Sequence, residues 1–151
     1  MPADGIPTVC VPVAELAGTV ERIRHELGHN RFVDLTAIDR LTREERFELV
    51  YLFYSMQHNT WLRLKSRTDS EAPSITPDIP GANWYEREVF DLFGVRFAGH
   101  PDLQRIMLPD DWQGHPLRRS EPLGSEPVDF TVTREAYGVG SQVAGLGEEH
   151  V

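Results

Sequence analysis

Apolar residues recur at helical spacing near the start of the chain and at alternate or consecutive positions further on. Between residues 13 and 27 they fall three or four positions apart, and Gly28 follows as a cap for a helix end. Residues 32–39, 47–54 and 61–67 are short runs rich in β-branched or aromatic side chains, separated by polar connections. The pattern predicts a helix followed by three strands in an antiparallel meander.

The second and third strands differ in the exposure that their patterns predict. Residues 47–54 form the most apolar run of the chain, which is typical of a central strand buried on both faces. In residues 61–67 apolar and charged residues alternate, so we expect Leu62 and Leu64 to point inward and the charged side chains outward.

A second helix is predicted after a proline-rich connection. Residues 69–83 contain three prolines and are expected to run extended over the surface or along a sheet edge. Asn83 offers a side-chain oxygen as an N-cap, and Glu86 stands three residues later in the position of a capping box. The helix predicted over residues 84–93 should end at Gly94.

These elements divide the chain into four parts and indicate an α+β fold. Residues 1–12 are an irregular leader, and residues 13–94 are an α+β domain that combines the N-terminal helix, a small antiparallel sheet and the second helix. Residues 95–122 are an extended segment, called the interaction arm below. Residues 123–151 are acidic and glycine-rich, and we expect a flexible tail there.

Composition narrows the classes of partner and site. The chain has 151 residues, enough for one domain with a buried core, and its net charge of −9 argues against a nucleic-acid partner. A single cysteine, Cys10, excludes an internal disulfide and an iron–sulfur cluster held by cysteines of this chain alone. No run approaches the roughly 18 apolar residues that cross a bilayer, so we expect membrane association only through a partner.

Residue types that bind metals or carry out catalysis occur without the spacing that such sites need. Potential metal ligands cluster in one short region, but they form none of the tight ligand patterns and are expected to hydrogen-bond turns instead. These residues are His100, Asp102, Asp110, Asp111 and His115. No nucleophile motif and no phosphate-binding glycine loop is present. The sequence therefore predicts no catalytic, cofactor or metal site on this chain.

The composition of residues 84–119 favours a protein-recognition surface over a catalytic or metal site. It is rich in aromatic residues and arginines, which are enriched in the centres of protein interfaces. The interaction arm has too many prolines and glycines for a long regular element, yet it holds apolar residues that need burial. We favour contact with another protein over packing on this domain. The candidate interface residues are Glu86, Arg87, Asp91, Phe97, His100, Pro101, Asp102, Leu103, Arg105, Asp110, Trp112, His115, Arg118 and Arg119.

The motifs of the same region are specific to one family. The pieces WYERE, DLFG, GHPDL, LPDDW and GHPLR closely resemble the signature of the C subunit of the proton-pumping NADH:quinone oxidoreductase, respiratory complex I. The resemblance extends over residues 31–119. It implies a non-catalytic assembly subunit in the hydrophilic part of a complex that moves electrons from NADH through iron–sulfur clusters to quinone and translocates protons.

The resemblance also implies partners, cofactors and a location. The neighbours would be the large subunit that shapes the quinone site and the subunit that holds the terminal cluster. FMN, iron–sulfur clusters and quinone would lie on other subunits, and the chain would sit on the cytoplasmic face of the cell membrane through the complex. The sequence departs from the family pattern in two places: Ser120 and Glu121 replace an aspartate and an aromatic residue, and Gln104 replaces an arginine.

Two other interpretations stay open at this point. Related domains occur in membrane-bound hydrogenases and in dehydrogenases that take electrons from ferredoxin or a deazaflavin. A stand-alone metal-dependent enzyme would instead use His100, Asp102, Asp110 and His115.

Overall fold

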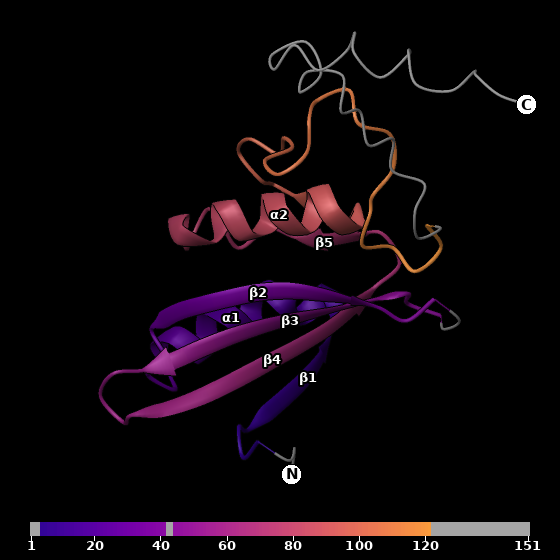
Figure 1. Cartoon of the computed structure of the whole chain (residues 1–151). Coiled ribbons are helices and arrows are strands. Elements are labelled where there is room, and N and C mark those ends of the chain that lie inside the picture. The colour runs from indigo at the N-terminus through magenta and orange to yellow at the C-terminus, as the bar shows by residue number, and fades with distance from the viewer. Residues whose placement is uncertain (1–3, 42–43, 122–151) are drawn as a thin grey trace, which may run out of the picture. The chain divides into compact units, whose positions relative to one another are not determined.

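The computed structural model describes residues 4–41 and 44–121 (Figure 1). The flexible tail predicted for residues 123–151 lies outside these ranges. The described part combines two α-helices with a four-stranded sheet and a separate pair of short strands, so the predicted α+β fold is confirmed.

The main sheet has the strand order β1-β4-β3-β2. Strands β2 (Arg31–Asp39), β3 (Phe47–Ser55) and β4 (Thr60–Thr68) are antiparallel neighbours, which confirms the predicted meander. The leader predicted to be irregular instead contains β1 (Thr8–Pro12), which pairs in parallel with β4 and makes the sheet mixed. Pro7 before this run and Pro12 at its end made it look irregular, but an edge strand tolerates proline because only one side of its backbone needs a partner.

Helix α1 (Leu16–His25) follows a short 3₁₀ turn, η1 (Val13–Glu15), and covers one face of the sheet, as Figure 1 shows. Leu16, Val20 and Ile23 lie on one side of the helix and are buried in the core. Beyond the helix Gly28 adopts a φ of 67°, and the N–H of His29 donates to the carbonyl of Ile23 at 3.0 Å. The predicted helix and its terminating glycine are thus confirmed.

Strand β3 is buried on only one of its faces. Its inward side chains, among them Leu49, Tyr51 and Phe53, are fully buried under the helices. Val50 and Leu52 point the other way and are only half-buried. The prediction of burial on both faces was wrong for the described part of the chain, because only one side of the sheet carries a helical layer.

The second helix and its surroundings form the other half of the domain. Strand β5 (Glu71–Pro73) pairs in parallel with β6 (Arg96–Ala98), and a 3₁₀ turn, η2 (Pro80–Ala82), leads into α2 (Asn83–Phe93). Gly94 ends α2 with a left-handed φ of 75°, as predicted. β6 lies within the range assigned to the interaction arm, so the first residues of that range form a strand.

The predicted capping box at the start of α2 does not form. Ala82 is the N-cap residue, Asn83 is already helical, and no side chain caps the helix. The carboxylate of Glu86 turns instead toward the loop after β5, where it accepts a hydrogen bond from the N–H of Ile75 at 2.7 Å. η2 carries the chain directly into α2, so a side-chain cap is not needed to start the helix.

Gly18→Ala should stabilise the protein. Gly18 lies inside α1, and a Cβ atom at this position would meet nothing within 4 Å. Alanine restricts the unfolded chain more than glycine does, so we expect the free energy of unfolding to rise by about 0.5–1 kcal/mol. Urea denaturation of the two proteins measures the change, and a decrease would mean that the helix needs this glycine for a contact.

Candidate functional site: helix α2 and the interaction arm

Beyond β6 the interaction arm has no regular element up to Glu121 and folds back over α2 (Figure 1). Its contacts with α2 come mostly from polar groups that bind backbone atoms. The backbone itself takes part, because the N–H of Leu117 donates to the carbonyl of Leu92 at 3.1 Å. The residues singled out by the sequence thus lie on two segments that contact each other.

Asp91 is the centre of these contacts. Its side chain is fully buried, and Oδ2 accepts hydrogen bonds from three consecutive N–H groups, those of Ile106, Met107 and Leu108, at 2.8–3.0 Å. Burial acts to raise the pKa of Asp91, but these three N–H groups and Arg105 outweigh it, so the pKa is lowered. The carboxylate therefore stays charged and holds a turn of the interaction arm by its backbone.

Arg105 pairs with the other oxygen of this carboxylate and extends the contact. Its Nη1 lies 2.6 Å from Asp91 Oδ1, and its Nη2 donates to the carbonyls of Trp112 and Gly114 at 3.2 and 3.1 Å. Arg87, one turn before Asp91 on α2, donates to the carbonyls of Gln104 and Arg105 at 3.1 Å. The two arginines thus hold the interaction arm through its backbone carbonyls and not through its side chains.

The C-terminal end of α2 is capped by the last part of the interaction arm. His115 Nδ1 donates to the carbonyl of Asp91 at 2.8 Å, and Arg118 Nε donates to the carbonyl of Phe93 at 2.6 Å. The unpaired carbonyls at a helix C-terminus carry partial negative charge, so the N–H donor of His115 and the positive charge of Arg118 are both favourable there. Gly94 is needed here, since a Cβ atom would lie 2.5 Å from the His115 ring and collide with the Arg118 guanidinium.

A second carboxylate anchors the end of the described segment to the sheet. Asp39, at the end of β2, forms an ion pair with Arg46 at 2.6 Å and accepts a hydrogen bond from the N–H of Arg119 at 2.9 Å. The hydrogen bond from Arg46 holds the pKa of Asp39 far below its usual range, although burial acts to raise it. The N–H groups of Leu41 and Arg119 also lower this pKa. The interaction arm is therefore fixed to both α2 and β2.

The third buried carboxylate, Glu86, joins α2 to the start of the interaction arm. It accepts hydrogen bonds from Ser74 Oγ at 2.6 Å and Thr76 Oγ1 at 2.8 Å, and its Oε2 lies 3.9 Å from Nε2 of the buried His100. His100 Nδ1 accepts a hydrogen bond from the N–H of Asp102 at 3.0 Å. Burial raises the pKa of Glu86 despite these donors.

The candidate interface residues differ widely in exposure. The buried ones are Glu86, Asp91 and Phe97. The residues that are half-buried as a whole are Arg87, His100, Leu103, Arg105, Trp112, His115 and Arg118. The side chain of His100 itself is fully buried. The exposed ones are Pro101, Asp102, Asp110 and Arg119. Most of the polar groups among them bind other atoms of this chain. The sequence had instead favoured contact of the interaction arm with another protein over packing on this domain. Contact with another protein through the remaining surface stays a prediction.

That remaining surface includes three exposed apolar side chains beside its charged ones. Trp84 on α2 and Met107 and Leu117 on the interaction arm are 67%, 63% and 51% exposed. Large apolar side chains are more often found in contact with other protein atoms than with water, and three of them on two adjoining segments favour an interface.

The possible metal ligands are not gathered. Within residues 4–41 and 44–121, no three histidine, cysteine, aspartate or glutamate side chains are arranged to hold a metal ion. His100 and His115 each contact a backbone carbonyl of α2, while Asp102 and Asp110 are exposed. In the same ranges no helix has both the length and the apolar content to cross a membrane.

Sequence reasoning missed Asp39, Arg46, Ser74 and Thr76, which hold the two segments to the rest of the domain. A signal for Asp39 was available, because it occupies the inward position that follows Leu35 and Ala37 in the alternation of β2. A charged residue at such a position needs a partner. The partner itself, Arg46, could not be identified from spacing along the chain.

Asp91→Asn should release the interaction arm. The change leaves Arg105 without its anion and weakens the acceptor shared by three N–H groups, so the free energy of unfolding should fall by about 3 kcal/mol. Urea denaturation and protease cleavage within residues 99–121 measure the effect. Asp110→Asn, which removes an exposed charge from the same segment, should change neither, and an equal effect of both variants would contradict the role of Asp91.

Acidification should loosen the interaction arm through His115. Burial, with repulsion from Arg118 and Arg105, lowers the pKa of His115 against the raising effect of its bond to Asp91. Below its unfolded value of about 6.5, the unfolded chain binds a proton that the folded chain resists binding, so stability falls as pH falls.

We therefore expect hydrogen-exchange protection of the amides of residues 106–108 to decrease by up to about tenfold for each pH unit below 6.5. His115→Asn keeps a donor near the Nδ1 position but does not titrate, and should lose this pH dependence. If protection depends on pH equally in the parent protein and in His115→Asn, the pH dependence comes from another titratable group.

Comparisons with known proteins agree with the resemblance. The family described as "Respiratory-chain NADH dehydrogenase, 30 Kd subunit" matches residues 9–127. The NADH-quinone oxidoreductase C subunit of Roseiflexus sp. (strain RS-1) is 47% identical over 113 residues, which cover 73% of this chain and 65% of that protein. The mitochondrial NADH-ubiquinone oxidoreductase 30.4 kDa subunit of Neurospora crassa is 55% identical over 92 residues, which cover 60% of this chain and 32% of that protein.

One further relative and one solved structure are also similar to this chain. The NADH-quinone oxidoreductase C/D subunit of Methylococcus capsulatus is 43% identical over 80% of this chain and 22% of its own length. This chain thus spans less than two thirds of the length of each of these three relatives. A chain of the membrane-bound sulfane sulfur reductase, an archaeal respiratory membrane complex, shares the fold, with a TM-score of 0.67 and 24% identity over 95% of this chain and 84% of that chain. The chain belongs to the family of the 30 kDa subunit of respiratory-chain NADH dehydrogenase.

Proposed function

We propose that this chain is a non-catalytic assembly subunit in the peripheral part of a proton-translocating NADH:quinone oxidoreductase. The observation that carries the proposal is the extent of the family match, which covers the main sheet, α2 and the interaction arm without interruption. In this role the chain supports electron transfer from NADH through iron–sulfur clusters to quinone by holding other subunits in position.

The geometry of α2 and the interaction arm supports a structural role. The ionisable groups that could act on a substrate, Asp91, Arg105 and His115, are engaged with each other or with backbone atoms. Side chains bound to each other and to the backbone hold the interaction arm in one conformation. A fixed surface of this kind suits a subunit that positions other subunits. We therefore assign FMN, the iron–sulfur clusters and quinone to other subunits of the complex.

The partners proposed are the large subunit that shapes the quinone site and the subunit that holds the terminal cluster. The surface proposed for at least one of them is the exposed apolar group Trp84, Met107 and Leu117. Through these partners the chain would lie on the cytoplasmic face of the cell membrane as a peripheral component.

A second candidate is the equivalent subunit of a related respiratory complex that takes electrons from another donor. The shared fold of the sulfane sulfur reductase chain is the observation that favours it. We prefer the NADH-linked function because the relatives with 43–55% identity are named NADH-quinone or NADH-ubiquinone oxidoreductase subunits. Purification of the tagged chain from its own cells separates the two, since only the first predicts NADH:quinone reductase activity in the recovered complex.

Placing charges on the exposed apolar group should prevent assembly without unfolding the chain. We expect Met107→Asp combined with Leu117→Asp to reduce recovery of partner subunits and NADH:quinone activity by at least about tenfold, because each buried charge would lack a partner. Leu27→Asp is the control, since Leu27 is equally exposed at 51% but lies at the end of α1.

The urea midpoint of the double variant should stay close to that of the parent protein. Normal recovery of partners by the double variant would remove this surface from the proposed interface, and failure of the parent protein to recover any partner would contradict the function.

A further inference from the structure

Met107 is a large apolar side chain that the fold holds out toward water. It lies in the turn of the interaction arm bound by Asp91, whose Oδ2 accepts the N–H groups of Ile106, Met107 and Leu108 at 2.8–3.0 Å. Ile106 and Leu108 are half-buried, whereas Met107 is 63% exposed. Three bonds to one fully buried carboxylate fix the backbone on both sides of Met107. The outward position of its side chain therefore belongs to the fold and does not come from fraying.

The other two members of the exposed apolar group also stand on an ordered backbone. The N–H of Leu117 donates to the carbonyl of Leu92 at 3.1 Å, and Trp84 lies in the first turn of α2. A surface that is ordered before binding loses little conformational entropy on binding. A flexible thioether also fills an irregular apolar pocket well, and methionine is enriched in the centres of protein interfaces. Met107 thus has the properties of an interface anchor.

The sulfur of Met107 makes this anchor sensitive to oxidation. A peroxide transfers one oxygen atom to a thioether: the O–O bond breaks, an S=O bond forms, the sulfur loses two electrons, and the peroxide leaves as water or an alcohol. Because Met107 is mostly exposed, a peroxide can reach it. The product is a polar sulfoxide whose oxygen accepts hydrogen bonds. Burying that oxygen against apolar atoms without a donor is unfavourable.

We propose that Met107 is an oxidation-sensitive anchor: its thioether docks into an apolar pocket of a partner subunit, and oxidation by a peroxide prevents docking. The surface and the partner rest on the proposed function, and the oxidation of Met107 adds a control on their use. A free chain that meets peroxide is excluded from the complex, whereas in an assembled chain the partner covers the sulfur. A methionine sulfoxide reductase reverses the modification, since the sulfoxide and two thiols give the thioether, a disulfide and water.

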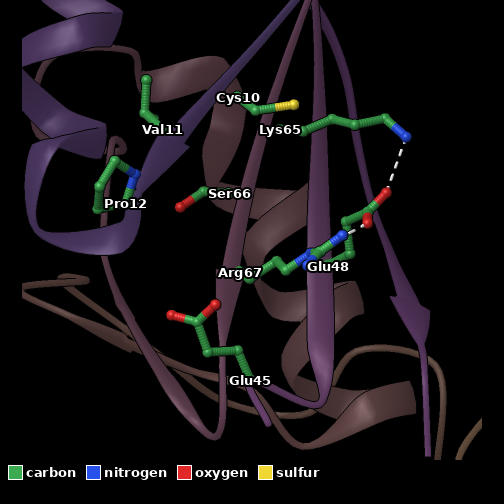
Figure 2. Close-up of a pocket in the computed structure, with 8 residues that line it drawn as sticks. All are labelled: Cys10, Val11, Pro12, Glu45, Glu48, Lys65, Ser66 and Arg67. Carbon is green, nitrogen blue, oxygen red and sulfur yellow. Dashed lines mark hydrogen bonds and ion pairs between the residues drawn. The ribbon is translucent and has the colours of Figure 1, made fainter. Parts of the chain in front are cut away.

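The chain supplies a matched control and one competing sulfur. Met56, 64% exposed, lies in the turn between β3 and β4 and is as accessible to peroxide as Met107. The thiol of Cys10 also reacts with peroxide. Figure 2 shows this exposed thiol on β1 beside Lys65, and β1 lies at the opposite edge of the sheet from β2, the strand that α2 contacts. All measurements therefore use a chain with Cys10→Ser, which removes the thiol away from the exposed apolar group.

Oxidation rates test whether a partner covers Met107. Hydrogen peroxide is applied to the isolated chain and to the purified complex, and mass spectrometry follows the tryptic peptide that begins after Arg105 and contains Met107. Met107 should be oxidised readily in the isolated chain. In the complex its oxidation should be at least about tenfold slower, because the partner shields the sulfur. Equal rates in the two samples, or resistance of Met107 in the isolated chain, would overturn the proposal while leaving the proposed function in place.

Recovery of partners tests the effect of the sulfoxide. The tagged chain, fully oxidised, is mixed with an extract of its own cells that lack the untagged chain, and the retained subunits are identified. We expect oxidation to lower recovery of the NADH:quinone oxidoreductase subunits by at least about tenfold, and a methionine sulfoxide reductase to restore it. The urea midpoint of the isolated chain should not change, because Met107 is exposed in the fold. A lower midpoint would mean that the sulfoxide acts on the fold, which contradicts the proposal.

Two leucine substitutions assign the effect to one sulfur. Recovery by Met107→Leu should be the same before and after peroxide, each compared with the same variant, whereas Met56→Leu should stay as sensitive as the parent. The opposite pattern, or equal recovery by the oxidised and untreated parent, overturns the proposal and leaves the proposed function. If untreated Met107→Leu recovers no partner, loss and restoration in Met56→Leu decide, because Met107 is then the only methionine besides Met1. Recovery of no partner by the untreated parent overturns both this proposal and the proposed function.

Discussion

A charged carboxylate with no exposure to water holds the interaction arm in place. Asp91 accepts three backbone N–H groups and a guanidinium, and each of these donors would lose its partner if the carboxylate were absent. Because the donors come from a segment without helix or strand, these bonds replace the regular hydrogen bonding that the segment lacks. The capping of α2 by His115 and Arg118 depends on the same arrangement, since both residues follow the turn that Asp91 fixes.

Two further acids repeat this principle elsewhere in the domain. Glu86 binds the loop after β5 to α2, and Asp39 binds the end of the described segment to β2. Their pKa values move in opposite directions because Asp39 has a guanidinium at 2.6 Å, whereas the donors around Glu86 are neutral or, for His100, more distant. Irregular segments in this protein are thus held by buried carboxylates, and the regular elements are held by an apolar core.

Local patterns in the sequence were sufficient for most of the fold and insufficient for the site. Helical spacing, strand alternation and the terminating glycines identified both helices and the meander, because each of these signals depends only on nearby residues. Strand β1 was missed because a parallel edge pairing leaves no alternation strong enough to outweigh two flanking prolines. Apart from the N–H of Leu41, the partners of Asp91, Glu86 and Asp39 lie between 7 and 80 residues away in the chain, and spacing along the sequence does not identify them.

The bond between Arg119 and Asp39 joins positions 80 residues apart, and it bears on how the protein is made. The ribosome delivers β2, then the rest of the sheet, then α2, and only afterwards the segment that binds them. Domains generally fold as they emerge, so the sheet and α2 would be present while Asp91 and Asp39 still await part of their donors. A chain interrupted before residue 105 would carry a buried acid without its guanidinium, and quality-control proteases would meet it as an incompletely folded protein.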